Sequence, residues 1–177
     1  MASLRQIYPR MLSHGANNVV IALSDNEVGK LFEEGNRAEL IREAELMQFA
    51  NSVNDLVVRF LRMEQHRESG NDMLVMQRLY PIDFRAYEIE RRQLWLDVFE
   101  HELKQLHQAG FVHRDLIRMA ERPGLKYDNI LLTASGLRLI DVGISTMRGQ
   151  VEERLFRLMV KKELEELEQF KSFFLNR

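Results

Sequence analysis

The chain has 177 residues, of which 45% are hydrophobic and 29% charged, as is typical of a folded globular domain. Its formal net charge of −2 gives no argument for nucleic acid or an anionic membrane as a partner, and the lack of cysteine excludes disulfides and thiolate metal sites. No apolar run approaches the roughly 20 residues of a membrane span. The N-terminus lacks a signal-peptide core, so we expect no membrane span and a cytoplasmic location.

Three short strands are predicted over residues 11–14, 19–23 and 27–32, because apolar runs there are separated by turn residues rich in Gly, Asn, Ser and Asp. Lys30 lies in the third of these strands. Taken alone, strand alternation favours the interpretation of Lys30 as a lysine on the solvent face of an exposed strand.

A helix is predicted over residues 36–51 from its apolar periodicity, with Asn36 as a plausible N-cap. Two further strands, residues 56–63 and 72–79, are predicted on either side of a polar turn.

A long amphipathic helix is predicted over residues 86–109, ended by Gly110. A second long helix covers residues 151–175. Its apolar stripe is predicted to contain Phe156, Val160, Leu164, Leu167 and Phe174. Further aromatic residues near its end indicate either packing against the 86–109 helix or a surface for a partner.

Between these helices, two apolar runs flank a Ser-Gly turn and predict a β-hairpin. Asn129 precedes the first run and Asp141 follows the second, so we expect their side chains to lie close together. Asp115 arrives from the preceding loop. Two carboxylates and an amide oxygen are ligands that suit Mg²⁺.

These residues resemble the motifs of the protein-kinase fold. His113-Arg114-Asp115 matches the HRD motif, the segment ending at Asn129 resembles Leu-Lys-x-x-Asn, and Asp141-Val142-Gly143 stands in the place of DFG. The resemblance covers roughly residues 10–145.

The resemblance implies an α+β, protein-kinase-like fold with two lobes. Residues 1–79 would form a five-stranded antiparallel N-lobe in which the 36–51 helix takes the αC position. Residues 80–177 would form a truncated, mainly helical C-lobe with a catalytic loop over 113–129, the metal-binding Asp141 and the C-terminal helix.

The activity that the resemblance implies is ATP- and Mg-dependent phosphoryl transfer to a Ser or Thr hydroxyl. Asp115 would be the catalytic base, Lys126 would steady the transferring group, and Asn129 and Asp141 would hold the metal. Lys30 would position the phosphates while paired with a glutamate of the 36–51 helix. Glu43 fits that pairing position best, and Glu39 is second.

The remaining nucleotide contacts follow from the same alignment. Gly15 would lie in the phosphate-covering loop, and the backbone of Gln77 and Leu79 would hydrogen-bond the adenine. Apolar side chains would surround the base, namely Val28, Met76 and Leu131.

The chain departs from the family in its catalytic loop. Thirteen residues separate Asp115 from Asn129, where the kinase motif has four. We interpret residues 116–124 as an insertion that projects outward and leaves Asp115 near Asn129.

Two other functions remain open. One is a pseudokinase that acts as a nucleotide-binding or protein-interaction module, and the other is a small-molecule kinase. The expected partners are ATP and either a protein substrate or a regulatory protein. Compact chains of this kind resemble the kinases of bacterial effectors and toxins, for which a host cytosol location would follow.

Overall fold

The computed structural model describes residues 10–14, 19–118 and 126–176. The fold is α+β, with a five-stranded antiparallel sheet and, among the described residues, three α-helices. The chain divides into two compact units, Met1–Glu45 with Arg59–Leu79, and Leu46–Val58 with Tyr80–Arg177. The break after Leu79 falls where the sequence predicts the first lobe to end, but Leu46–Val58 belongs to the second unit.

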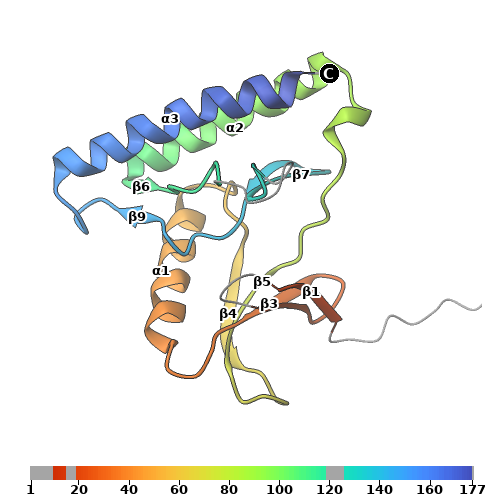
Figure 1. Cartoon of the computed structure of the whole chain (residues 1–177), viewed down its shortest axis with the longest axis vertical. Helices are drawn as coiled ribbons and strands as arrows, with labels where there is room; N and C mark the ends of the chain where they lie inside the picture. Colours follow the sequence, from red (N-terminus) through yellow and green to blue (C-terminus); the bar gives the residue numbers. More distant parts are fainter. Residues whose placement is uncertain (1–9, 15–18, 119–125, 177) are drawn as a thin grey trace, which may run out of the picture. The chain divides into compact units, whose positions relative to one another are not determined.

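The sheet forms the body of the first unit (Figure 1). Its strand order is β1-β2-β3-β5-β4, and all neighbouring strands are antiparallel. The strands are β1 (Arg10–His14), β2 (Val19–Ala22), β3 (Glu27–Leu31), β4 (Phe60–Gln65) and β5 (Asp72–Gln77).

The fourth strand begins later than the sequence predicts, at Phe60 rather than at residue 56. Val57 instead bridges to Leu139, and the Val58 N–H donates to the Leu139 carbonyl at 2.8 Å. These bonds commit the 56–58 segment to the second unit. The edge strand β4 that remains is mostly exposed and carries Arg62, which pairs with Glu27 and so protects the edge with charge.

Gly29 on β3 is required by packing. A Cβ atom at this position would lie 2.2 Å from the Met73 Sδ on the neighbouring strand β5. The missing side chain therefore lets Met73 pack, nearly fully buried, over Gly29, on the sheet face opposite to that of Lys30.

The three described helices are divided between the two units. The first, α1 (Arg37–Val53), begins in the first unit, and its later turns bury Leu46, Met47 and Ala50 in the second. The helices α2 (Ile89–Ala109) and α3 (Glu153–Leu175) lie side by side (Figure 1).

The predicted helix 86–109 begins three residues later than expected, because a short 3₁₀ turn, Phe84–Ala86, precedes it. The predicted stop is confirmed: Gly110 adopts φ 101°, and its N–H donates to the carbonyls of Leu106 and His107. Two-residue strands β6 (Phe111–Val112) and β9 (Thr146–Met147) then pair, as do β7 (Ile130–Thr133) and β8 (Gly136–Leu139).

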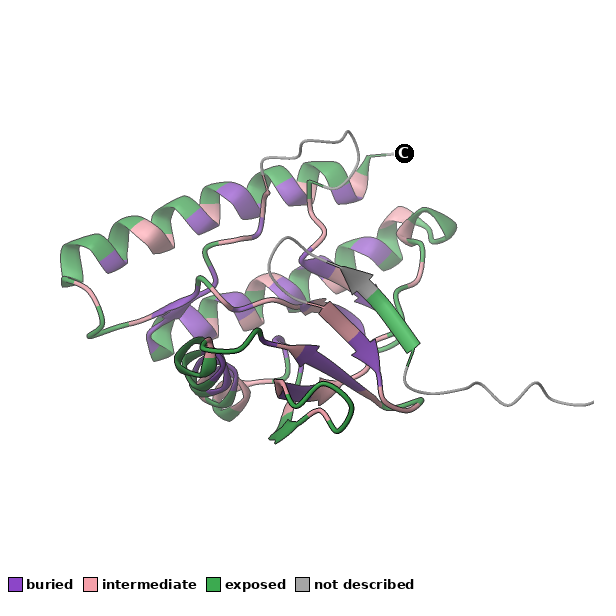
Figure 2. Ribbon diagram, turned by 60° about the horizontal axis from the view of Figure 1, so that its bottom comes forward, coloured by how far each residue is buried: buried purple, intermediate pink, exposed green. Residues whose placement is uncertain are grey.

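The buried face of α3 differs from the predicted stripe at two residues. Val160 and Leu164 are only half-buried, whereas Glu163 is buried with 1% of its surface exposed. Figure 2 shows the resulting alternation of buried and exposed residues along the helix. The buried residues are Phe156, Glu163, Glu166, Leu167, Phe170 and Phe174.

The aromatic residues near the end of α3 pack within their own unit. Tyr127 has its ring centre 4.7 Å from that of Phe173 and 5.3 Å from that of Phe170. Phe84 covers Phe174 at 4.8 Å. This cluster anchors the residue two before Asn129, and it accounts for the aromatic surplus without a partner.

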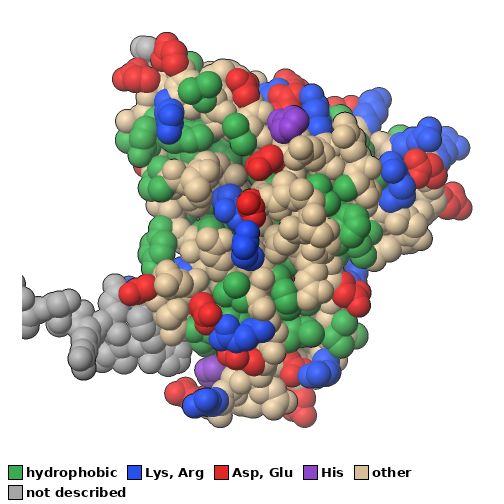
Figure 3. Space-filling model, turned by 180° about the vertical axis from the view of Figure 1, so that it is seen from behind, with side chains coloured by type: hydrophobic (Ala, Val, Ile, Leu, Met, Phe, Trp, Pro, Cys, Tyr) green, Lys and Arg blue, Asp and Glu red, His purple; other side chains and the backbone are tan. Residues whose placement is uncertain are grey.

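The surface carries charges of both signs. On the face shown in Figure 3, Lys and Arg side chains are interspersed with Asp and Glu over the described residues. None of the described helices is long and apolar enough to cross a membrane.

Candidate functional site

The predicted hairpin is formed by β7 and β8, and it joins Asn129 to the segment that carries Asp141. The Ile140 N–H donates to the Asn129 carbonyl at 3.0 Å, which ties the start of one strand to the end of the other. The strand pairing therefore holds the two candidate metal ligands on the same end of the hairpin.

His113 supports this arrangement from inside the protein. Its fully buried imidazole bonds to the Ile140 carbonyl through Nε2 at 2.9 Å, and its Nδ1 accepts the Asp115 N–H at 3.3 Å. Because Nδ1 accepts, the Nε2 atom carries the proton and donates. One side chain thus connects the backbone at Asp115 with the residue before Asp141.

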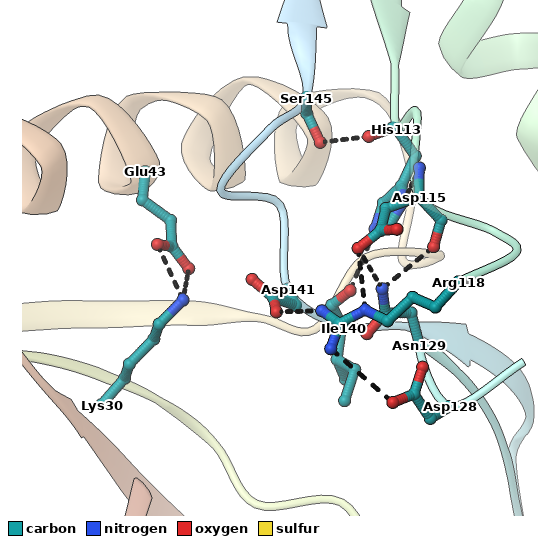
Figure 4. Close-up of polar contacts among 10 residues, drawn as sticks. All are labelled: Lys30, Glu43, His113, Asp115, Arg118, Asp128, Asn129, Ile140, Asp141 and Ser145. Carbon is teal, nitrogen blue, oxygen red and sulfur yellow. Dashed lines mark hydrogen bonds and ion pairs between the residues drawn. The ribbon is translucent and has the colours of Figure 1, made fainter. Parts of the chain in front are cut away.

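The predicted closeness of Asp115 and Asn129 is confirmed. The Asn129 Nδ2 donates to the Asp115 backbone carbonyl at 2.9 Å and to its Oδ2 at 2.8 Å (Figure 4). Since the amide nitrogen faces Asp115, the amide oxygen Oδ1 points to the opposite side of the amide group. That oxygen is the atom with which Asn129 could bind a cation.

The start of the insertion turns inward, so the prediction that residues 116–124 project outward is wrong for its first three residues. Leu116 is fully buried. The Arg118 guanidinium donates to Asp115 Oδ2 at 3.0 Å and to Asp141 Oδ2 at 2.6 Å, and its Nη1 lies 3.6 Å from Asp128 Oδ2 (Figure 4). Residues 119–124 lie outside the described residues.

Glu163 of α3 holds the opposite side of the loop. Its carboxylate accepts the backbone N–H of His113 at 3.2 Å and that of Arg114, and it accepts a bond from the His107 imidazole at 2.9 Å. A charged acceptor that binds two successive backbone donors fixes the direction of the chain as it enters Asp115.

Two residues of the candidate motifs have strained backbones. Arg114 has φ 71° and Asp141 has φ 59°, and they are the two described non-glycine residues with positive φ. Each such conformation costs about 1–3 kcal/mol and persists where surrounding contacts impose it. For Arg114 those contacts include Glu163 and the bonds from its guanidinium to the Ile144 carbonyl and the Thr146 hydroxyl.

In the first unit, Lys30 and Glu43 form the predicted ion pair. The Lys30 Nζ lies 2.8 and 2.9 Å from the two Glu43 carboxylate oxygens, and both side chains are more than 90% buried (Figure 4). Desolvating two charges offsets most of their attraction, so a buried pair is weak evidence of a stabilising role. Its burial beside a sheet marks it as a candidate functional group.

The residues predicted to contact a nucleotide base lie in the following places. Val28 is buried on β3 directly across from Met76 on β5, and Leu131 is half-buried on β7. The Gln77 N–H donates to the Arg59 carbonyl at 2.9 Å, so this donor is already engaged within the sheet. Leu79 is half-buried at the end of the first unit, and Gly15 lies outside the described residues.

Lys126 is directed differently from the predicted catalytic role. It is exposed, and its Nζ lies 6.0 Å from the centre of the Tyr127 ring. Its carbonyl accepts the Arg118 N–H at 3.0 Å, which joins the described residues on either side of 119–125.

The oxygen donors of Asn129 and Asp141 fit a Mg²⁺ ion, which takes one or two protein ligands and completes its shell with water and phosphate. Within residues 10–14, 19–118 and 126–176 there is no group of three or more His, Cys, Asp or Glu that could hold a metal. A cation here would therefore depend on oxygen atoms from a ligand.

Arg118, Glu163 and Tyr127 were not predicted as parts of the site. The sequence does contain a signal for Glu163, which lies seven residues after Phe156 and four before Leu167, in the apolar stripe of α3. A charge at a core position indicates a buried partner. Arg118 carries no such signal, because it belongs to an insertion without periodicity.

No model of a known protein family matches the chain, and no curated protein matches it.

The variant Glu163→Gln tests the loop support. The two backbone N–H groups bind different oxygens of the Glu163 carboxylate, so in a glutamine the amide NH2 would face one of these donors. A buried donor left unpaired costs about 1–3 kcal/mol. We expect the free energy of unfolding, measured with urea, to fall by about that amount. Glu165→Gln, at an exposed position of the same helix, is the control and should be near neutral. Equal effects of the two variants would contradict the assigned role.

The variant Glu166→Gln tests the pH dependence of stability. Burial raises the pKa of Glu166 above its usual value near 4.5, with Glu163 and Asp115 adding to the rise and Lys162 opposing it. Between the usual pKa and the raised pKa, Glu166 is protonated in the folded state and ionised in the unfolded state. The free energy of unfolding therefore falls as the pH rises through this range. The variant should remove this fall, giving a higher melting temperature than the parent at pH 8 and a similar one at pH 4. The exposed Glu168→Gln should show no such crossover; if it does, burial of Glu166 is not the cause.

Proposed function

We propose that the chain is an ATP- and Mg²⁺-dependent phosphotransferase, of the minimal Ser/Thr protein-kinase type. The observation that carries the proposal is the contact of Asp115 with Asn129, combined with the hairpin bond between Asn129 and the residue before Asp141. A proton acceptor and two hard oxygen ligands are thereby held within one continuous hydrogen-bonded structure. The buried Lys30–Glu43 pair of the first unit supports the proposal independently.

In the proposed reaction, the oxygen of an acceptor hydroxyl attacks the γ-phosphorus of ATP. The bond from that phosphorus to the β–γ bridging oxygen breaks, ADP leaves, and the hydroxyl proton passes to Asp115. A cation bound at Asn129 and Asp141 would neutralise charge on the phosphate oxygens. Lys30, held by Glu43, would bind phosphate in the role that this pair has in the protein-kinase mechanism.

The second candidate is a pseudokinase, a nucleotide-binding or interaction module without transfer activity. Two observations favour it: Arg118 is bonded to both Asp115 and Asp141, and Lys126 is directed toward Tyr127. Phosphoryl transfer would require Arg118 to leave the two carboxylates and Lys126 to move away from Tyr127. The phosphotransferase and the pseudokinase both bind nucleotide, and only the phosphotransferase turns it over.

Nucleotide binding is tested by thermal denaturation with Mg–ATP. A ligand at 100 times its Kd stabilises the folded state by about 2.7 kcal/mol, so the melting temperature should rise by several degrees. Asp141→Ala should lose most of that rise, because it removes a metal ligand, while Asp97→Ala, an exposed carboxylate on α2, should keep it. A melting curve that Mg–ATP leaves unchanged would exclude both the phosphotransferase and the nucleotide-binding pseudokinase.

Catalysis is tested by comparing Asp115→Ala with Lys30→Ala. One general base contributes roughly 10²- to 10⁴-fold in rate, so Asp115→Ala should cut turnover by about that factor with little change in nucleotide affinity. Lys30→Ala should lose both affinity and rate, because the lysine is assigned to the phosphates. Transfer of labelled γ-phosphate should be followed on protein and on soluble acceptors, which separates a protein kinase from a small-molecule kinase.

Full activity of Asp115→Ala would exclude the assignment of the base. Nucleotide binding without turnover in the parent protein would favour the pseudokinase.

A further inference from the structure

The guanidinium of Arg118 lies among three carboxylates of the candidate site (Figure 4). Each of its nitrogens faces a different one: Nε is 3.0 Å from Asp115 Oδ2, Nη2 is 2.6 Å from Asp141 Oδ2, and Nη1 is 3.6 Å from Asp128 Oδ2. These carboxylates come from both sides of the insertion and from the segment after β8. Arg118 is therefore a cation that contacts all three carboxylates.

The backbone of Arg118 is anchored. Its N–H donates to the Lys126 carbonyl at 3.0 Å, and Leu116, two residues earlier, is fully buried. The side chain itself is 40% exposed, so it can leave the carboxylates without exposing a buried core. An anchored backbone with a releasable side chain keeps the arginine at high local concentration beside Asp141.

Arg118 and a divalent cation need the same atoms. The Asp141 oxygen that accepts from Nη2 at 2.6 Å belongs to the carboxylate assigned to the metal in the proposed function. A guanidinium does not lose its proton in proteins, so its positive charge persists at every pH at which the chain is folded. A metal ion at Asp141 would therefore have to displace the hydrogen bond from Arg118, and the positive guanidinium beside it would repel it.

We propose that Arg118 is a built-in counter-cation that competes with the divalent metal for Asp141, and that the metal binds as the Arg118–Asp141 ion pair opens. The inference rests on the proposed function, whose site it regulates. In the absence of ligand, Arg118 neutralises part of the carboxylate charge and holds Asp115 and Asp141 together. Binding of metal and nucleotide then breaks the Arg118–Asp141 ion pair.

The test measures binding of Mn²⁺ alone, as a paramagnetic substitute for Mg²⁺, by electron paramagnetic resonance of the free ion. Interactions that are coupled to ligand binding typically change the ligand affinity by about 5- to 150-fold. Arg118→Gln should therefore bind Mn²⁺ about tenfold more tightly than the parent. Arg148→Gln removes the same charge from an exposed arginine that pairs with Glu153, and it should change the affinity less than twofold. The double variant Arg118→Gln/Asp141→Asn should lose the gain.

Other outcomes overturn the inference. Equal or weaker Mn²⁺ binding by Arg118→Gln, or no binding at all, would show that Arg118 does not compete. If Arg118→Gln fails to fold by circular dichroism, Arg118→Lys decides instead, because a lysine keeps the charge and cannot span two carboxylates. Its affinity should then exceed that of the parent, and an unchanged value would refute competition.

The Mg–ATP melting experiment keeps the two proposals apart. A parent that Mg–ATP stabilises, with no difference between Arg118→Gln and the parent, would leave the proposed function standing without the inference. A parent that Mg–ATP does not stabilise would remove the proposed function itself.

Discussion

The arrangement of the candidate site depends on one carboxylate, that of Glu163. It accepts the N–H groups of two successive residues, His113 and Arg114, from a position with 1% of its surface exposed. Without an acceptor there, two backbone donors would be left unpaired and the positive φ of Arg114 would lose one of the contacts that impose it. The last helix, α3, therefore does more than cover α2, because it sets the direction in which the chain reaches Asp115.

From that fixed point, a series of short contacts defines the rest of the site. His113 ties Asp115 to Ile140, Asn129 binds both the carbonyl and the carboxylate of Asp115, and Tyr127 packs its ring against the aromatic end of α3. The described start of the insertion bonds back to the chain beyond it, because the Arg118 N–H donates to the Lys126 carbonyl. The long spacing between Asp115 and Asn129 is thus compatible with the contact that the shorter loop of the kinase motif would make.

Several parts of this structure were predictable from the sequence, and the reasons differ. The Lys30–Glu43 pair follows from a lysine within a strand and a glutamate on the correct face of the next helix, and Asp115 meets Asn129 as the motif indicates. The inward turn of Arg118 was not predictable, because it depends on three carboxylates that converge only in the folded chain. Burial of Glu163 was missed because Leu164, its apolar neighbour, fits the helical period almost as well. The late start of β4 was missed because Val57, which the sequence places in that strand, pairs with Leu139 of the second unit.

The central claim is that Asn129 and Asp141 hold the cation of a bound nucleotide, and the most direct test locates that cation by NMR. Mn²⁺ added with a non-hydrolysable ATP analogue should broaden the backbone amide signals of Asn129, Ile130 and Asp141 first, whereas Mg²⁺ with the same analogue should broaden none. Broadening centred on another part of the chain, or its absence at Asp141 while the nucleotide binds, would contradict the account.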